Sequence, residues 1–173
     1  MNAAVFWGFK RGALAISRSN FRKFVEGSRF AGRPNSQGGE LFITDSSELL
    51  KVVDGYKGDL PRHMEQRLGL DKGSLGKDPM LGFVYEVGLH NPRAPSSNNL
   101  GANKHFVPGG KTSGGLPEGV VDRISIDTKI YMPSDQEGLV EAADIRFFGA
   151  EEFRRVKGLA RYLMNNMLHS VKE

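Results

Sequence analysis

The chain contains no cysteine, and this absence removes several kinds of chemistry at once. Disulfide bonds, thiolate nucleophiles and cysteine-ligated zinc are excluded. The histidines show no metal-ligand spacing either, so we expect no metal cofactor. A chain without cysteine also suits a reducing cytosol. The histidines are His63, His90, His105 and His169.

Long hydrophobic runs are missing as well. No stretch approaches the ~20 consecutive apolar residues of a membrane span, so we expect no membrane association. The apolar start, Met1 to Phe9, is too short for a signal peptide, and Lys10 and Arg11 follow it instead of preceding it. We therefore expect no cleavable signal peptide. The protein is expected in the cytoplasm, either of its own cell or of a cell into which it is delivered; an excised domain of a longer protein is a further option.

Acidic residues are scarce near the start of the chain. Between Gly8 and Arg33 a single acid, Glu26, stands among many cations. Such a run is either a solvated surface or a surface that binds the phosphates of a nucleotide or of RNA. The cations are Lys10, Arg11, Arg18, Arg22, Lys23, Arg29 and Arg33.

The length and the pattern of apolar residues predict one α+β domain spanning residues 1–173. A chain of 173 residues with 39% hydrophobic residues can bury one core without the help of disulfide bonds or a structural metal ion. Periodicity and capping residues predict helices, and short apolar runs predict strands. We expect helices at Arg18–Glu26, Asp45–Gly55, Pro61–Leu68 and Ala150–Val171, and strands at Val5–Phe9, Glu40–Thr44, Phe83–Val87 and Val120–Met132.

Two further predictions concern the first helix and the long loop after Asn91. The first helix is predicted to bury Phe21, Phe24 and Val25 on one face, with Ser17 or Ser19 as its cap. The segment from Asn91 to Pro117 is rich in Asn, Ser, Pro and Gly and shows almost no periodicity. A loop of that length in a compact domain is usually functional or disordered.

The order of these segments carries a resemblance. A strand near the start leads into Arg11, a second strand runs through Thr44-Asp45-Ser46-Ser47 into a helix, and a third is Gly82-Phe-Val-Tyr-Glu-Val87. A long loop then leads to Gly114-Gly-Leu-Pro-Glu118 and another strand. This order resembles the cholera- and pertussis-type ADP-ribosyltransferases of bacterial toxins and effectors. The resemblance implies a split β-sheet core with flanking helices and a C-terminal amphipathic helix.

The resemblance also implies roles for particular residues, with NAD as the substrate. Arg11, or alternatively Lys10, would hold the dinucleotide, because a guanidinium can fork onto phosphate oxygens. Hydroxyls of the second strand would orient a catalytic glutamate and support the nicotinamide pocket; these are Thr44, Ser46 and Ser47. Tyr85 falls on the central strand.

One departure from the family pattern leaves the catalytic residues open. Where the family has its catalytic glutamate, this chain has Asn103-Lys104-His105. The negative charge then has to come from Glu118 or Glu86, or Lys104 and His105 carry out a different chemistry. The candidate catalytic residues are therefore His105, Lys104 and Glu118.

Three functional hypotheses follow. The first is a toxin or effector that uses NAD to ADP-ribosylate a protein or nucleic acid, or that hydrolyses NAD. The second is a basic ribonuclease-like toxin with His105 as general base near an RNA phosphate. The third is an inactive binding module on the same fold. A macromolecular target in a host or competitor cell, and an immunity protein if the chain is toxic, are the expected partners.

Overall fold

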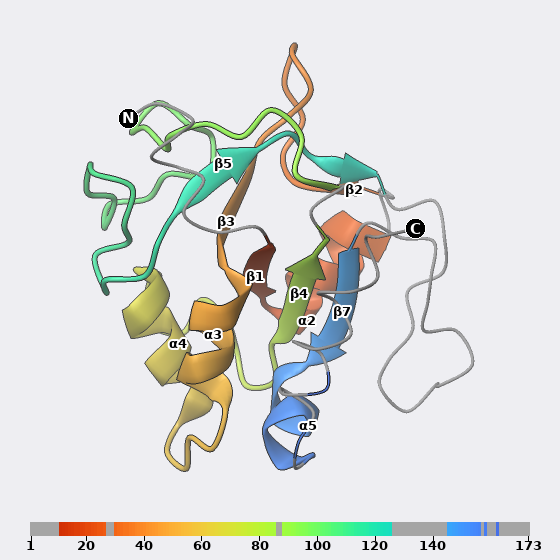
Figure 1. Ribbon diagram of the computed structural model, residues 1–173, viewed down its shortest axis with the longest axis vertical. Helices are drawn as coiled ribbons and strands as arrows, with labels where there is room; N and C mark the ends of the chain where they lie inside the picture. The colour runs from red at the N-terminus through yellow and green to blue at the C-terminus, as the bar shows by residue number, and fades with distance from the viewer. Residues whose placement is uncertain are drawn as a thin grey trace.

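The computed structural model describes residues 11–26, 30–85, 88–125 and 145–156, together with Gly158 and Tyr162. Its architecture is α+β: antiparallel strands form a five-stranded sheet in the order β5-β3-β1-β4-β7, and β2 and β6 pair separately (Figure 1). The strands are β1 (Gly12–Ile16), β2 (Phe30–Ala31), β3 (Leu41–Asp45), β4 (Met80–Val84), β5 (Gly119–Val121), β6 (Ile124–Ser125) and β7 (Ile145–Gly149). The helices are α2 (Arg18–Asn20), the π-helix η1 (Phe21–Glu26), α3 (Ser46–Val53), α4 (Leu60–Leu68) and α5 (Ala150–Arg155).

The central strand β1 was not predicted from the sequence. Glycine and alanine have low strand propensity, so the Gly12–Ile16 segment gave no strand signal. Packing explains the glycine at the start of the strand, because a Cβ atom on Gly12 would lie 2.9 Å from Cδ1 of Ile43. The predicted strand Val5–Phe9 lies outside the described residues.

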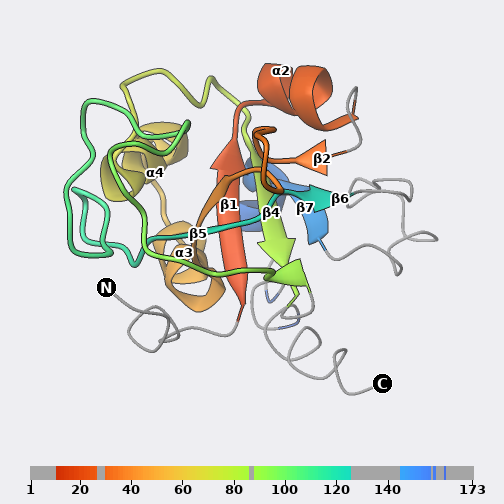
Figure 2. The same cartoon turned by 90° about the horizontal axis from the view of Figure 1, so that it is seen from above.

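The two faces of the sheet bury different clusters. On one face Ala13, Phe83 and Phe148 pack against the apolar sides of α3, α4 and α5. On the other face Val84 and Phe147 pack with Phe21 of η1. Figure 2 shows α3 and α4 on one side of β1 and β4, with α2 and β2 away from them. We call the first face the helix face.

The first predicted helix is confirmed in position but not in its buried face. The hydroxyl of Ser17 accepts a hydrogen bond of 3.2 Å from the amide of Asn20 and caps α2. The chain then continues as a π-helix, in which Phe21 and Val25 are buried while Phe24 is 53% exposed. The wider π-helical turn rotates Phe24 away from the core, so the expectation based on α-helical spacing was wrong for this residue.

The predicted start of the second helix at Asp45 is confirmed. Its backbone is extended, and its carboxylate accepts a 3.1 Å hydrogen bond from the amide of Glu48. Strand β3 therefore passes into α3 without a connecting loop. The next helix is also confirmed, because α4 is capped by Asp59 and ends at Gly69, which is in the left-handed conformation with φ 71°.

Two predicted strands have to be corrected. Strand β4 covers Met80–Val84 and not Phe83–Val87, and Tyr85 follows its end directly. The segment is buried on both faces and so lacks the polar–apolar alternation that marks strand limits. The single strand Val120–Met132 was also wrong: β5 and β6 belong to different sheets and are divided at Asp122 and Arg123. Residues 126–144 lie outside the described part.

The predicted helix Ala150–Val171 is not continuous. Helix α5 ends at Arg155, Val156 has an extended ψ of 103°, and Gly158 has a φ of 83°. Periodic apolar residues gave no sign of this break, because the pattern of spacing continues through it. Strand β7, directly before α5, was not predicted.

The predicted loop from Asn91 to Pro117 is confirmed as a segment without helices or long strands, and hydrogen bonds fix it to the body. The carboxylate of Glu40 accepts bonds from the amide of Leu100 at 2.6 Å and from the side chain of Asn99 at 3.0 Å. The bond from the Leu100 amide is the main reason that the pKa of Glu40 is lowered. Farther along, Thr112 donates to the carbonyl of Arg67.

Candidate functional site

Strand pairing places Arg11 and the hydroxyl-rich turn next to each other. Gly12 is paired with Asp45 and Ala13 with Thr44. The register continues one step beyond the ladder, because the amide of Ser46 donates a 3.0 Å hydrogen bond to the carbonyl of Arg11. The start of β1 and the end of β3 therefore meet at one end of the sheet.

Thr44 is the most unusual residue at this end. It is 2% exposed, and among the described residues its Oγ1 has no hydrogen-bond partner. A buried hydroxyl without a partner costs roughly 1–3 kcal/mol relative to a satisfied one. Thr44 shares a cross-strand row with Ala13, which faces the helices, so its side chain belongs to the helix face.

Among the described residues, Ser46 and Ser47, unlike the hydroxyl of Thr44, take part in hydrogen bonds that hold the start of α3. The hydroxyl of Ser47 makes a short hydrogen bond to the carboxylate of Asp45, and that carboxylate also caps α3. Ser47 thus takes part in holding the first turn of the helix. Ser46 is buried, and its backbone is fixed by Arg11.

Glu118 reaches the same end of the sheet from β5. Ile43 is paired with Gly119, so Thr44 and Glu118 occupy the next positions on the two strands. The amide of Glu118 donates a 2.8 Å hydrogen bond to the carbonyl of Gly110. Burial raises the pKa of Glu118 to about 7, because a charged carboxylate is poorly solvated there.

Tyr85 also lies at this end. Val84 is paired with Gly12, so Tyr85 and Arg11 follow at the same level on neighbouring strands. Tyr85 is 8% exposed and packs with the cluster of the helix face. The guanidinium carbon of Arg146 lies 5.5 Å from the centre of its ring.

Arg146 was missed by the sequence analysis, although a signal was present. It stands alone as a charged residue in the otherwise apolar strand β7. Its partner in the ladder is Phe83, and its Nε is buried without a hydrogen-bond partner among the described residues.

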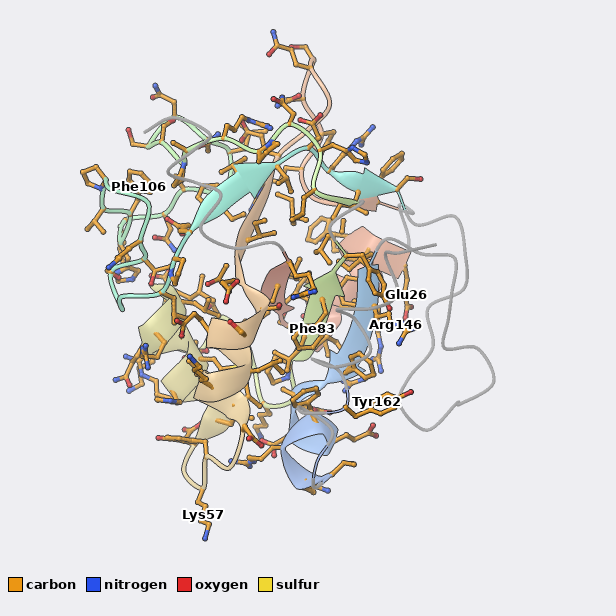
Figure 3. The ribbon with its side chains drawn as sticks, in the orientation of Figure 1. Glu26, Lys57, Phe83, Phe106, Arg146 and Tyr162 are labelled. Carbon is orange, nitrogen blue, oxygen red and sulfur yellow. The ribbon has the colours of Figure 1, made fainter. Side chains whose placement is uncertain are left out.

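His105 and Lys104 lie in a different group. Nε2 of His105 is 2.8 Å from Oδ1 of Asp71, and Nζ of Lys104 is 3.7 Å from the same oxygen. The hydrogen bond with His105 is the largest of the effects that lower the pKa of Asp71. Phe106, the residue after His105, and Arg146 appear on opposite sides of the molecule in Figure 3. We call His105, Lys104 and Asp71 the loop cluster.

Hydrogen bonds made by Asn103 and Glu65 hold the loop cluster in place. Asn103 donates a 3.0 Å hydrogen bond to the carbonyl of Gly69, at the end of α4. The buried carboxylate of Glu65 accepts 3.0 Å hydrogen bonds from the amides of Gly73 and Leu75, which fixes the turn that carries Asp71. Asp71 was missed by the sequence analysis, because nothing in the local pattern links it to His105.

Two of the named alternatives, Lys10 and Glu86, lie outside the described residues. In the described part of the chain no group of three or more His, Cys, Asp and Glu side chains is arranged to hold a metal ion. Within the same residues, no helix has the length and hydrophobicity required to cross a membrane.

Five residues from four strand ends, Arg11, Thr44, Ser46, Tyr85 and Glu118, thus form one group, which we call the sheet-end site. It combines a cation, hydroxyls, an aromatic ring and a carboxyl group with a raised pKa. No protein-family model matches the chain, and comparison with curated proteins finds no match.

Proposed function

We propose that the chain is an NAD-using enzyme of the ADP-ribosyltransferase type, which transfers ADP-ribose to a macromolecule or to water. The observation that carries this proposal is the sheet-end site: strand pairing brings Arg11, Thr44 and Glu118 to one end of the sheet. In the family that this sequence resembles, an arginine, the hydroxyl residues of a turn and a glutamate bind NAD and act on it.

Glu118 is the residue that supplies negative charge in this proposal. As the bond between the ribose carbon and nicotinamide breaks, positive charge develops on the ribose, and a carboxylate nearby stabilises it. Nicotinamide leaves with the bonding electrons, and an acceptor hydroxyl, amine or water then adds to the ribose carbon and releases a proton. Lys104 and His105 cannot supply negative charge, and both side chains lie against Asp71.

The other residues of the site position the substrate and the acid. Arg11 binds phosphate oxygens of the dinucleotide through its fork of donors. Thr44 carries a buried hydroxyl next to Glu118 in the register, and this hydroxyl orients the carboxylate when substrate is bound. The half-buried surroundings that raise the pKa of Glu118 also strengthen its interaction with a developing charge.

The test is nicotinamide release from NAD by the purified protein, with and without cell lysate as a source of acceptors. Wild type is expected to release nicotinamide, and Arg11→Ala to reduce both NAD binding and turnover. Lys57→Gln is the matched control, since Lys57 is exposed and points away from the body in Figure 3. Absence of NAD binding at millimolar concentration in isothermal titration would remove the proposal.

A second candidate rests on the loop cluster. A histidine oriented by an aspartate beside a lysine is an arrangement suited to general base catalysis on an RNA phosphate. Ribonuclease activity that is lost in His105→Ala, with RNA binding that weakens as salt rises, would favour it over NAD chemistry.

A further inference from the structure

The two buried polar side-chain atoms without partners in the described part of the chain lie in one row across the sheet. They are Oγ1 of Thr44 and Nε of Arg146. Thr44 is paired with Ala13. Ala13 is paired with Phe83, and Phe83 with Arg146. All four residues therefore face the helices, and Arg146 belongs to the same face of the sheet as the sheet-end site.

The side chain of Arg146 runs from this row toward the end of the sheet. Its guanidinium lies against the ring of Tyr85, one residue beyond the end of β4. Tyr85 and Arg11 stand at the same level of the register. Arg146 is therefore directed to the level of Arg11, with Tyr85 between the two arginines.

We infer that Arg146 and Arg11 together bind a diphosphate group above the ring of Tyr85. Their strands, β7 and β1, are separated by one strand, which puts their backbones about 10 Å apart. Two long side chains at that separation converge on a diphosphate from both sides, one guanidinium for each phosphate. Arginine suits this task because its planar fork matches two phosphate oxygens.

The second reason for this assignment is that Nε of Arg146 has no hydrogen-bond partner among the residues that the structure describes. A buried donor on a charged group is costly to leave without an acceptor, and an anionic ligand supplies one. Tyr85 provides an apolar and quadrupolar surface beside the guanidinium, which keeps the arginine extended toward the ligand.

This inference rests on the proposed function for the identity of the dinucleotide, but the anion site can be tested without turnover. Isothermal titration would measure binding of inorganic pyrophosphate, ADP-ribose and nicotinamide riboside, which lacks phosphate. Arg146→Gln is expected to weaken pyrophosphate and ADP-ribose binding at least tenfold and to leave nicotinamide riboside unchanged. Arg155→Gln, an exposed arginine of α5, is the matched control and should change each affinity less than twofold.

Arg146→Lys separates charge from geometry and replaces the glutamine variant if that variant does not fold. A lysine keeps the charge but loses the fork, so we expect pyrophosphate binding three- to tenfold weaker than wild type. In turnover assays, KM for NAD should rise more than kcat falls.

The outcomes distinguish this inference from the proposed function. Pyrophosphate and ADP-ribose binding unchanged in both Arg146 variants would overturn the diphosphate site, even if wild type releases nicotinamide. Pyrophosphate binding that depends on Arg146, in a protein that never releases nicotinamide, would support the site and contradict the proposed function. Equal weakening by Arg155→Gln would overturn the inference by showing an unspecific charge effect.

Discussion

The sheet-end site and the loop cluster differ in how the fold holds them. The first is assembled by strand register from β1, β3, β4 and β5, so its residues are fixed by backbone hydrogen bonds. The second is an exposed set of side chains that pair with one another, where His105 is 37% and Asp71 54% exposed. Rigid strand ends position groups more firmly than exposed ion pairs, which contribute little energy.

The two regions also differ in what their polar groups cost. In the sheet-end site Thr44 is buried without a partner among the described residues, and burial opposes ionisation of Glu118. In the loop cluster the polar groups satisfy each other. Buried polar groups that lower stability and make no structural contact are found at functional sites more often than surface side chains whose hydrogen bonds are satisfied. The comparison therefore favours the sheet end as the place of chemistry.

The largest effect is expected from Glu118→Gln. The amide keeps the size of the side chain but cannot carry negative charge, so nicotinamide release should fall at least about 100-fold while NAD binding changes little. His105→Ala should leave the rate within twofold. A larger loss in His105→Ala than in Glu118→Gln would reverse the comparison.

The next largest effect concerns the way kcat/KM for NAD depends on pH. With a pKa of about 7, the ionised fraction of Glu118 rises about tenfold between pH 6 and pH 8, and kcat/KM for NAD should rise with it. His105→Ala should show the same profile. A profile that shifts when His105 is removed would assign the titration to the loop cluster.

The same pKa predicts a trend in stability. The folded state binds the Glu118 proton more tightly than the unfolded chain, where the pKa is near 4.5, so the contribution of this group is full below pH 4.5 and is lost as pH rises through about 7. Relative to Glu118→Gln, the free energy of unfolding of wild type should therefore decline across this interval. Urea unfolding at several pH values measures it, and a rise instead of a decline would contradict the raised pKa.

Thr44→Val and Thr112→Val form a matched pair that separates function from stability. Thr44→Val removes a buried hydroxyl that has no partner in the described part of the chain, so stability should hold or rise by about 1 kcal/mol while nicotinamide release falls roughly tenfold. Thr112 donates to Arg67 and accepts from the amide of Leu116. Thr112→Val should cost about 1–3 kcal/mol with the rate unchanged.

Thermal unfolding and initial rates would check the threonine pair. If Thr44→Val destabilises the protein as much as Thr112→Val does, the hydroxyl of Thr44 makes a structural hydrogen bond, and the role proposed for it is wrong.

The smallest effect is expected on breaking the loop cluster. His105→Ala removes an exposed pair with Asp71, so the free energy of unfolding should change very little. Urea unfolding measures this change. A loss of several kcal/mol would show that the cluster is a structural anchor.

Local signals in the sequence predicted the parts of the fold that depend on local chemistry. The helix start at Asp45, a cap at Ser17 or Ser19 and the loop after Asn91 were predicted, because capping side chains and turn residues act within a few positions. Strand β1 was missed because glycine and alanine give no strand signal, and Gly12 reflects close packing against Ile43, a contact distant in sequence. The break after Arg155 was missed because apolar spacing does not report backbone conformation.

The residue types of the candidate site could be predicted from the sequence, and the grouping of the arginine with the hydroxyl-rich turn was implied by the family resemblance alone. The hydroxyl-rich turn and the arginine could be named, yet the register that joins Arg11 to Ser46 and Gly119 to Ile43 depends on non-local pairing. The same limit explains why the pairing of His105 with Asp71 and the position of Arg146 were not foreseen.

The most direct test of the account is to titrate the isotope-labelled protein with NAD and follow the amide resonances by NMR. We predict shift changes that saturate with NAD and concentrate at Ser46, Thr44, Tyr85 and Glu118, with little change at Asp71 and His105. Changes confined to the loop cluster, or no saturable change at millimolar NAD, would contradict it.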